Sequence, residues 1–337
     1  RYNDESKDLD KRTVNYAGAR AADTCPAANV IVRGRPRDGA IISDLRSHEW
    51  QGLDRDKDKW TWSLNTQWDA TDDAMLYASV STGFKSGGFD EAYSGAGEVI
   101  RLTDDILTGE PNGQTIPGAD ASILGYDDET VISYEVGAKM GLLEGAAELN
   151  IAVFRSEYDD LQTSSLVGDV FRVGNAGEAI TQGVEIDGRW AITERLTLGG
   201  SLAYLDAYYD DFKGATCTVP QATDPAANPG CLREDGSNIE AGETGGQDLE
   251  DEDLLFAPEW SSNLNVTYIY PFNNGMELST SVDMNYSDEF YSSLDLDPNT
   301  KHDDYVKWNA RIALSGDNDN WTVAIIGKNL TDETTYA

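Results

Sequence analysis

Few residues in this 337-residue chain could do covalent chemistry. Its two histidines, His48 and His302, fall in stretches expected to be loops, and neither can be assigned to a Ser/His/Asp arrangement. No residue pattern marks an activated nucleophile or a site that activates water. No C-x-x-C pair is present, so a zinc or redox centre has no support either. The sequence therefore argues against an enzyme.

The long loops carry residues that could cross-link or bind ions. Cys217 and Cys231 share a loop rich in Gly and Pro, which a disulfide would close in an oxidising compartment, and Cys25 has no assigned partner. Asp248 to Asp253 spells DLEDED, and a loop with such dense carboxylates could fold around Ca²⁺. The alternative is that these acids are only solvated. The expected calcium ligands are Asp248, Glu250, Asp251 and Asp253, and no other cofactor is expected.

The composition excludes some partners. Lys and Arg total 25 against 61 Asp and Glu, a net charge of -36, which disfavours nucleic acid and the surface of an anionic membrane. The mean hydropathy of -0.48 is typical of soluble proteins. That value is misleading for a membrane β-barrel, whose strands turn only every second residue to lipid. No run of about eighteen apolar residues exists, so the sequence excludes a transmembrane helix.

Four stretches alternate apolar and polar residues, near 132–140, 264–270, 276–286 and 306–314. In the first, Ile132, Tyr134 and Val136 alternate with Ser133 and Glu135. Period two is typical of a strand with one apolar and one polar face. Three of the runs last roughly nine to eleven residues, the length that a tilted strand needs to cross a bilayer, and the run at 264–270 is shorter.

Short and long connections alternate between the expected strands. The short ones carry Gly, Pro, Asn and Asp, whereas the long ones run near 85–128, 159–179, 211–255 and 291–303. In outer-membrane barrels the short turns face the periplasm and the long loops face outside. Residues 1–59 are expected to be mostly one more long loop. The ten expected strands lie near 60–70, 74–84, 129–140, 147–158, 180–191, 196–208, 256–270, 276–289, 304–315 and 321–328.

The two faces of these strands differ in chemistry. Trp60, Trp62 and Trp68 are expected on one face of the first full strand, where they suit a lipid boundary. Charged residues such as Glu135 and Glu185 would lie on the face of the strands opposite the apolar side chains. Charges buried in a dry interior are costly unless they are paired. A wide, hydrated or plug-filled lumen would accommodate them. The alternative is a lattice of ion pairs that lines the wall without binding a ligand.

Several segments resemble conserved parts of TonB-dependent outer-membrane receptors. Residues 76–79 (LYAS) lead into 83–89 (GFKSGGF), and 158–162 (YDDLQ) precede 175–177 (NAG) and 183–185 (GVE). Two later segments, APEW at 257–260 and KNLTDE at 328–333, follow in family order. The resemblance covers about residue 47 to the end of the chain.

This resemblance implies an all-β fold, a transmembrane antiparallel β-barrel. About ten or more strands of a probable barrel of about 22 would lie in this chain. Residues 1–337 would form the C-terminal portion of the barrel, with the N-terminal plug domain and the last strands outside this chain. The expected location is the outer membrane of a Gram-negative bacterium, which the chain would cross many times.

The resemblance also implies TonB-dependent active uptake of a scarce nutrient, of the siderophore, vitamin or oligosaccharide class. Expected partners are outer-membrane lipid, a small nutrient ligand and an inner-membrane energy-coupling complex that acts through the missing N-terminal region. Phe84, Phe89 and Tyr93, at the base of a long loop, are expected to stack on the ligand. Two alternatives stay open: a passive porin or adhesion barrel without energy coupling, and a structural barrel partnered with a surface lipoprotein or a surface layer.

Overall fold

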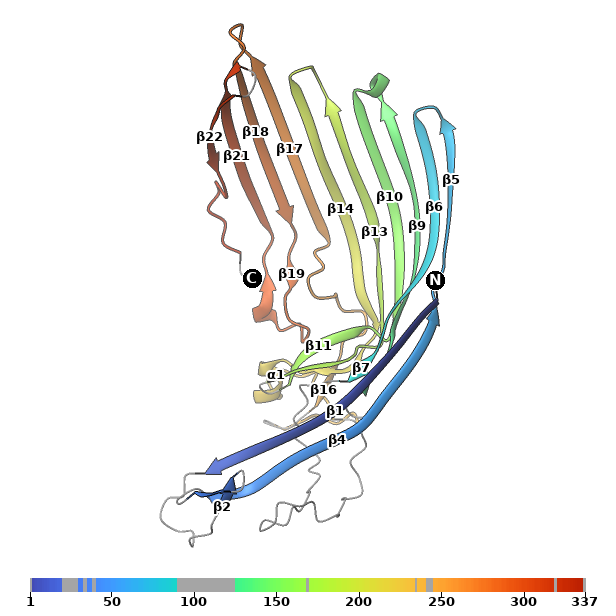
Figure 1. Ribbon diagram of the computed structural model, residues 1–337, viewed down its shortest axis with the longest axis vertical. Coiled ribbons are helices and arrows are strands. Elements are labelled where there is room, and N and C mark those ends of the chain that lie inside the picture. The colour runs from blue at the N-terminus through green and yellow to red at the C-terminus, as the bar shows by residue number, and fades with distance from the viewer. Residues whose placement is uncertain are drawn as a thin grey trace.

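A computed structural model of the chain is built almost wholly from antiparallel strands (Figure 1). None of the helices in the described part of the chain is long and apolar enough to cross a membrane. The structure describes residues 2–19, 30–32, 35–37, 41–89, 125–167, 170–233, 235–240, 245–317 and 320–335.

One ten-stranded sheet dominates the structure, in the order β22-β21-β18-β17-β14-β13-β10-β9-β6-β5. Neighbours in the sheet follow one another along the chain, so each inner strand pairs with the sheet strand before it and the sheet strand after it. Five short turns connect alternate pairs at the upper end of Figure 1, as the sequence predicts. The strands are β5 (Ser63–Thr71), β6 (Ala74–Lys85), β9 (Glu129–Leu142), β10 (Ala147–Asp159), β13 (Glu178–Ala191), β14 (Leu196–Asp211), β17 (Trp260–Pro271), β18 (Glu277–Ser287), β21 (Tyr305–Ser315) and β22 (Thr322–Gly327).

All ten predicted strands are therefore present, with small differences at their ends. The largest is in β17, which begins at Trp260 and not near residue 256. Phe256 has a φ of 56°, in the left-handed region that interrupts a strand. Pro258 has no N–H to donate to a ladder. Both features delay the start of β17.

The prediction for residues 1–59 is wrong. β1 (Tyr2–Ala19) pairs antiparallel with β4 (Ile41–Trp60) in a long ribbon, which also carries the short pair β2 (Val30–Val32) and β3 (Arg35–Arg37). The ribbon sequence is rich in charges and has no alternating apolar face, so the pattern that identified the other strands is absent.

The placement of three tryptophans also differs from the prediction. Trp60 ends β4 and Trp62 lies between β4 and β5, so neither shares a strand with Trp68 in β5. All three side chains are nevertheless exposed.

The apolar face of the sheet is continuous across strands. Leu76, Ala138, Ile151, Ile186 and Leu202 are register partners in five neighbouring strands, from β6 to β14. Many side chains on this face are exposed, including Leu202 at 41%. No second layer covers it in the described part of the chain, which is the arrangement expected of a lipid-facing wall.

The polar face carries a ladder of hydrogen-bonding side chains. Lys139, Asn150, Asp187, Ser201 and Asn263 are register partners, in five strands from β9 to β17. The Asn150 side chain donates to Asp187 Oδ2 at 2.9 Å. Alternation places five more charged residues on this side: Glu135, Glu185, Arg189, Asp283 and Arg311.

The height of the apolar band suits a bilayer. On β14, Leu196 at the turn end and Tyr204 near the loop end are separated by a length of about 26 Å along the strand. A tilt of about 40° reduces this to roughly 20 Å, near the height of the lipid-facing band of a membrane barrel. Exposed aromatic side chains lie near both ends of the strands, with Trp190 and Tyr270 at the turn end and Tyr134 and Trp260 at the loop end.

A charge near the middle of the apolar face should therefore destabilise the protein. Ile151→Arg is expected to lower the free energy of unfolding by about 2–4 kcal/mol in lipid vesicles, because the guanidinium would enter hydrocarbon. Asn150→Arg, one residue away on the polar face beside Asp187, is the matched control and should cost under about 1 kcal/mol. Urea titrations of the protein folded in vesicles measure both values. Equal losses of unfolding free energy in the two variants would mean that both faces of the sheet contact the same solvent.

Candidate functional site

Four pairs of short strands gather at the end of the sheet opposite the short turns, where Figure 1 labels β7, β11, β16 and α1. We call the described residues of the segments 86–89, 125–128, 160–177, 212–259 and 288–304 the collar. Its described part contains one 3-10 turn and one short helix as well. Its elements are β7 (Gly88–Phe89), β8 (Gly125–Tyr126), β11 (Gln162–Val167), β12 (Val170–Asn175), β15 (Lys213–Thr216), α1 (Val219–Thr223), β16 (Gly246–Asp248), β19 (Phe290–Tyr291), the 3-10 turn Pro298–Thr300 and β20 (Lys301–His302).

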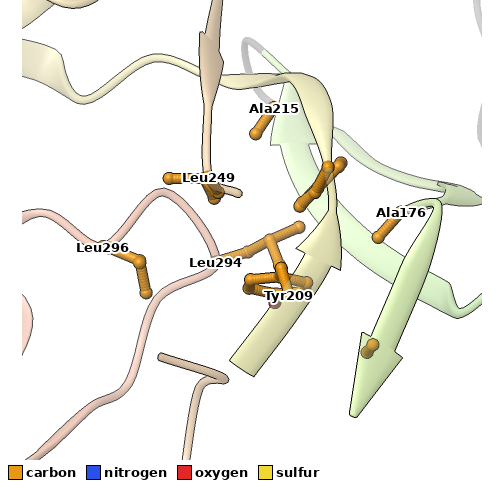
Figure 2. Packing of buried hydrophobic residues seen from close by; sticks show 8 residues of the cluster. Ala176, Tyr209, Ala215, Leu249, Leu294 and Leu296 are labelled. Carbon is orange, nitrogen blue, oxygen red and sulfur yellow. The ribbon is translucent and has the colours of Figure 1, made fainter. Parts of the chain in front are cut away.

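The buried apolar core lies in the collar and not behind the sheet. Tyr209, at the far end of β14, is fully buried and packs with Phe212 at a ring-centroid distance of 5.0 Å. Figure 2 shows Leu249, Leu294 and Leu296 gathered around it from two other loops. These contacts hold the loops that carry Leu249 and Leu296 against the end of β14.

β14 exchanges one partner for another where it enters the collar. Its pairing with β17 ends at Tyr204 and Trp260. Beyond that point the Tyr209 N–H donates to Glu252 O at 3.0 Å, and the Asp251 N–H donates to Tyr209 O at 2.8 Å. The loop before β17 thus takes the place of a strand beside β14, which satisfies backbone groups that would otherwise lack partners.

Gln162 joins two loops of the collar through its backbone and its side chain. Its N–H donates to Glu129 Oε2 at 2.8 Å. Its side-chain amide donates to the carbonyl oxygens of Lys85 and Ser86, both at 3.2 Å, and of Asp127 at 3.0 Å. One side chain therefore fixes both ends of the loop between β6 and β9 against the start of β11.

Asn175 completes this arrangement, which we call the amide clamp (Gln162 and Asn175). Its Oδ1 accepts from the Asp127 N–H at 2.7 Å, and its Nδ2 donates to Asp160 O at 2.7 Å and to Asp127 O at 3.1 Å. Gly177 follows in the left-handed region with a φ of 54°, and a Cβ there would lie 2.2 Å from Asp211 O. Only glycine fits that position, which explains the spacing of Asn175 and Gly177 in the sequence.

The amide clamp can be tested with an isosteric change. Gln162→Glu removes the side-chain N–H donors and sets a carboxylate against three carbonyl oxygens. We expect the Asp127 N–H to exchange with solvent about 5- to 30-fold faster, as a local loss of about 1–2 kcal/mol requires. Ser164→Ala, at an exposed position of β11, is the control. Hydrogen exchange read by mass spectrometry measures the effect, and equal rates in the two variants would contradict the clamp.

The predicted disulfide is present. Cys217 and Cys231 are joined, with their Cα atoms 5.7 Å apart. The enclosed segment contains α1, which Thr218 begins with a reciprocal capping box: its hydroxyl accepts from the Gln221 N–H at 3.2 Å, and its own N–H donates to Gln221 Oε1 at 2.8 Å. Cys25 lies outside the described residues.

Removal of the disulfide should loosen this part of the collar. The chain-entropy model gives about 3 kcal/mol for a closed loop of this size. Cys217→Ser together with Cys231→Ser should make the segment between them sensitive to limited proteolysis under conditions in which the native protein resists. Cys25→Ser serves as the control. Resistance unchanged in the double variant would show that the crosslink does not order the loop.

The expected calcium ligands do not converge. Asp248 Oδ1 accepts from the Glu250 N–H at 3.1 Å, while Glu250 lies 3.6 Å from Lys213 Nζ. Asp251 has a φ of 65°, and Asp253 forms an isolated bridge with Tyr208. Among the residues that the structure describes, no three His, Cys, Asp or Glu side chains are placed to hold a metal ion. The calcium site gains no support from this arrangement and stays a prediction.

Two lysines of the collar are engaged by neighbouring carboxylates. Lys213 Nζ lies 2.7 Å from Asp211 Oδ1, and Lys301 Nζ lies 2.6 Å from Glu289 Oε1. In each case this hydrogen bond raises the pKa of the amine. Both lysines stay charged, so they offset part of the negative charge of the acidic surface in which they lie.

The three expected aromatic ligand contacts are not brought together. Phe84 follows Leu76 by eight positions on β6 without a register shift, so alternation places it on the apolar face of the wall. A ligand on the polar side would not reach it there. Phe89 lies in β7, within the collar. Tyr93 lies outside the described residues.

The polar wall offers a cluster that the sequence patterns did not single out. The Tyr77 hydroxyl donates to Glu135 Oε1 at 2.6 Å, and Lys139 Nζ lies 5.9 Å from the centre of the Tyr77 ring. The Tyr77 ring covers Gly137, where a Cβ would lie 2.5 Å from its atoms. The glycine at position 137, between Glu135 and Lys139 on the polar face, was the one sign in the sequence that a bulky side chain covers this point. The arrangement places a phenol, a carboxylate and an ammonium together on the polar face.

Most of the chain matches a known protein family. Residues 32–330 match the family model described as TonB dependent receptor-like, beta-barrel. The metal-pseudopaline receptor CntO of Pseudomonas aeruginosa (strain UCBPP-PA14) is 30% identical over 115 residues, which cover 34% of this chain and 16% of that protein. This chain thus spans only a small part of the curated relatives that it matches.

Solved structures share the fold at low identity. The ferric-catecholate import receptor Fiu of E. coli K12, in its closed form, has a TM-score of 0.57 at 15% identity, over 98% of this chain and 37% of that one. The ferric yersiniabactin uptake receptor FyuA of Yersinia pestis has a TM-score of 0.54 at 15% identity, over 86% and 35%. The receptor PiuA of Acinetobacter baumannii has a TM-score of 0.53 at 18% identity, over 88% and 34%. With its wall, collar and family match taken together, the chain belongs to the TonB-dependent receptor β-barrel family.

Proposed function

We propose that the protein containing this chain is an outer-membrane receptor of a Gram-negative bacterium. It would import a scarce nutrient with energy from a TonB complex. The observation that carries the proposal is the family match over residues 32–330. The two-faced wall and the collar of connected loops support it, because they suit a lipid-embedded pore with a structured mouth. The protein would act as a transporter and not as an enzyme, in keeping with the lack of a catalytic motif in its sequence.

The substrate class that we favour is a complex of a metal with an organic chelator. CntO is named as a receptor for metal-pseudopaline, and FyuA as a receptor for ferric yersiniabactin. A chelate carries several oxygen and nitrogen atoms, which the Asn, Asp and Lys side chains of the polar wall could bind. Phe89, in the collar, stays our proposed aromatic contact, and Tyr93 a second one. Vitamins and oligosaccharides remain competing substrates.

Uptake by whole cells tests the proposal. Cells that express the full-length protein should accumulate an isotope-labelled metal when it is supplied with a chelator, and a proton uncoupler should abolish the accumulation. Cells without the gene give the background. Accumulation that persists with the uncoupler would identify a passive porin. Accumulation of a labelled oligosaccharide or vitamin, with none of the metal, would reject the substrate class but keep the transport.

A further inference from the structure

A cavity of about 300 Å³ lies where β14 parts from β17, at the border between the sheet and the collar. Its walls come from the end of β14, from the loop that precedes β17, and from β19 and β20. Backbone hydrogen bonds fix these walls: the Leu205 N–H donates to Glu259 O, and the Phe256 N–H donates to Tyr291 O, both at 2.8 Å. The volume is at the lower end of the range for small-molecule sites. The cavity is therefore preformed and sized for a small ligand.

The charge of the cavity determines the kind of ligand that it can hold. Lys301 is the single basic residue in its lining. Five acidic residues line it as well: Asp206, Asp253, Glu259, Asp288 and Glu289. Within the described part of the chain, no other residue donates a hydrogen bond to the carboxylate of Asp253 or Glu259. The cavity therefore repels phosphates and carboxylates and attracts a cation.

The cation that fits the cavity is organic and not a metal ion. No three acidic, histidine or cysteine side chains of the described residues are placed to hold a metal, so the carboxylates lie around a space wider than one ion. The aromatic residues Tyr204, Phe290 and Tyr291 also line the cavity. Ring faces attract an ammonium and give apolar contact to the methylene groups that carry it. This combination of rings and carboxylates suits an alkyl chain that ends in an ammonium.

The chain itself places one ammonium in this setting. Lys301 Nζ lies 2.6 Å from Glu289 Oε1 and 5.4 Å from the centre of the Tyr291 ring. This pair neutralises one carboxylate and leaves the other four to a ligand. We propose that the cavity binds an alkylamine through its ammonium group. The ammonium donates to the Glu259 carboxylate, and the alkyl chain lies against the Phe290 ring.

Isothermal titration calorimetry of the purified full-length protein tests the proposal. The probes are cadaverine, a diamine with an ammonium at each end of its chain, and the terminal pentanediol, which has the same chain length and no charge. Cadaverine should bind, and more weakly as salt is added, because salt screens partly exposed charges. Pentanediol should not bind. Equal binding of the two probes, or no binding of cadaverine, would overturn the proposal.

Variants separate the cavity from the acidic surface around it. Glu259→Gln should weaken the binding of cadaverine about fivefold, as the loss of one partly exposed ion pair requires. Glu252→Gln, the same change in the same loop but outside the lining, is the matched control and should bind as wild type. Ala257→Trp fills the cavity and should abolish binding, and gel mobility of unheated samples checks that each variant folds. Equal losses in the two glutamine variants would mean that cadaverine senses only the acidic surface, and binding unchanged in Ala257→Trp would place it elsewhere.

An alkylammonium can belong to a free amine or to a metal chelate, and the second case rests on the function proposed above. Two iron(III) trihydroxamates distinguish these sources, one with a free pentylammonium tail and one with that tail acetylated. Tighter binding of the first, lost in Glu259→Gln, would assign the cavity to capture of the transported chelate. Equal binding of the two chelates, with cadaverine still bound, would assign it to free amines. Cadaverine binding does not depend on uptake, so failure of the transport proposal would leave the site standing.

Discussion

Hydrocarbon offers no partner to a backbone N–H or C=O, and this constraint organises the structure. Every strand of the large sheet must satisfy its polar groups on its neighbours, so the chain runs to and fro in one continuous antiparallel ladder. The ladder fixes the register of the strands. The register in turn places odd-numbered and even-numbered side chains of a strand on opposite faces of the sheet. Ile151 and Asn150 are adjacent in sequence but belong to different surfaces, one for lipid and one for a polar interior.

A single-layered wall cannot stabilise long loops through a core of its own, so the collar has to build one. Tyr209 and its leucine neighbours supply apolar contacts, the amide clamp supplies directed hydrogen bonds, and the Cys217–Cys231 disulfide closes a segment of the connection between β14 and β17. The first two devices connect different loops, and the third braces one loop internally. A binding surface made from such loops would have a defined shape before a ligand arrives, which lowers the entropy cost of binding.

The sequence predicted the ten strands because four of them show the period of two that a two-faced wall imposes, and because short turns and long loops alternate along the chain. The β1–β4 ribbon was not predicted, because its many charged residues leave no regular alternation of apolar and polar positions. The amide clamp could not be foreseen, since the contacts of Gln162 depend on two loops that meet only after folding. The ligand contact of Phe84 stays a prediction, although parity counted from Leu76 assigns this residue to the apolar face.

An accessibility scan along β10 tests the two-faced wall most directly. Nitroxide labels at single cysteines introduced at positions 149 to 154, in a Cys25→Ser background in vesicles, report their collisions with oxygen, which concentrates in hydrocarbon. The structure predicts high oxygen accessibility at Leu149, Ile151 and Val153 and low accessibility at Asn150, Ala152 and Phe154. An oxygen profile without a period of two would contradict a wall that has lipid on only one side.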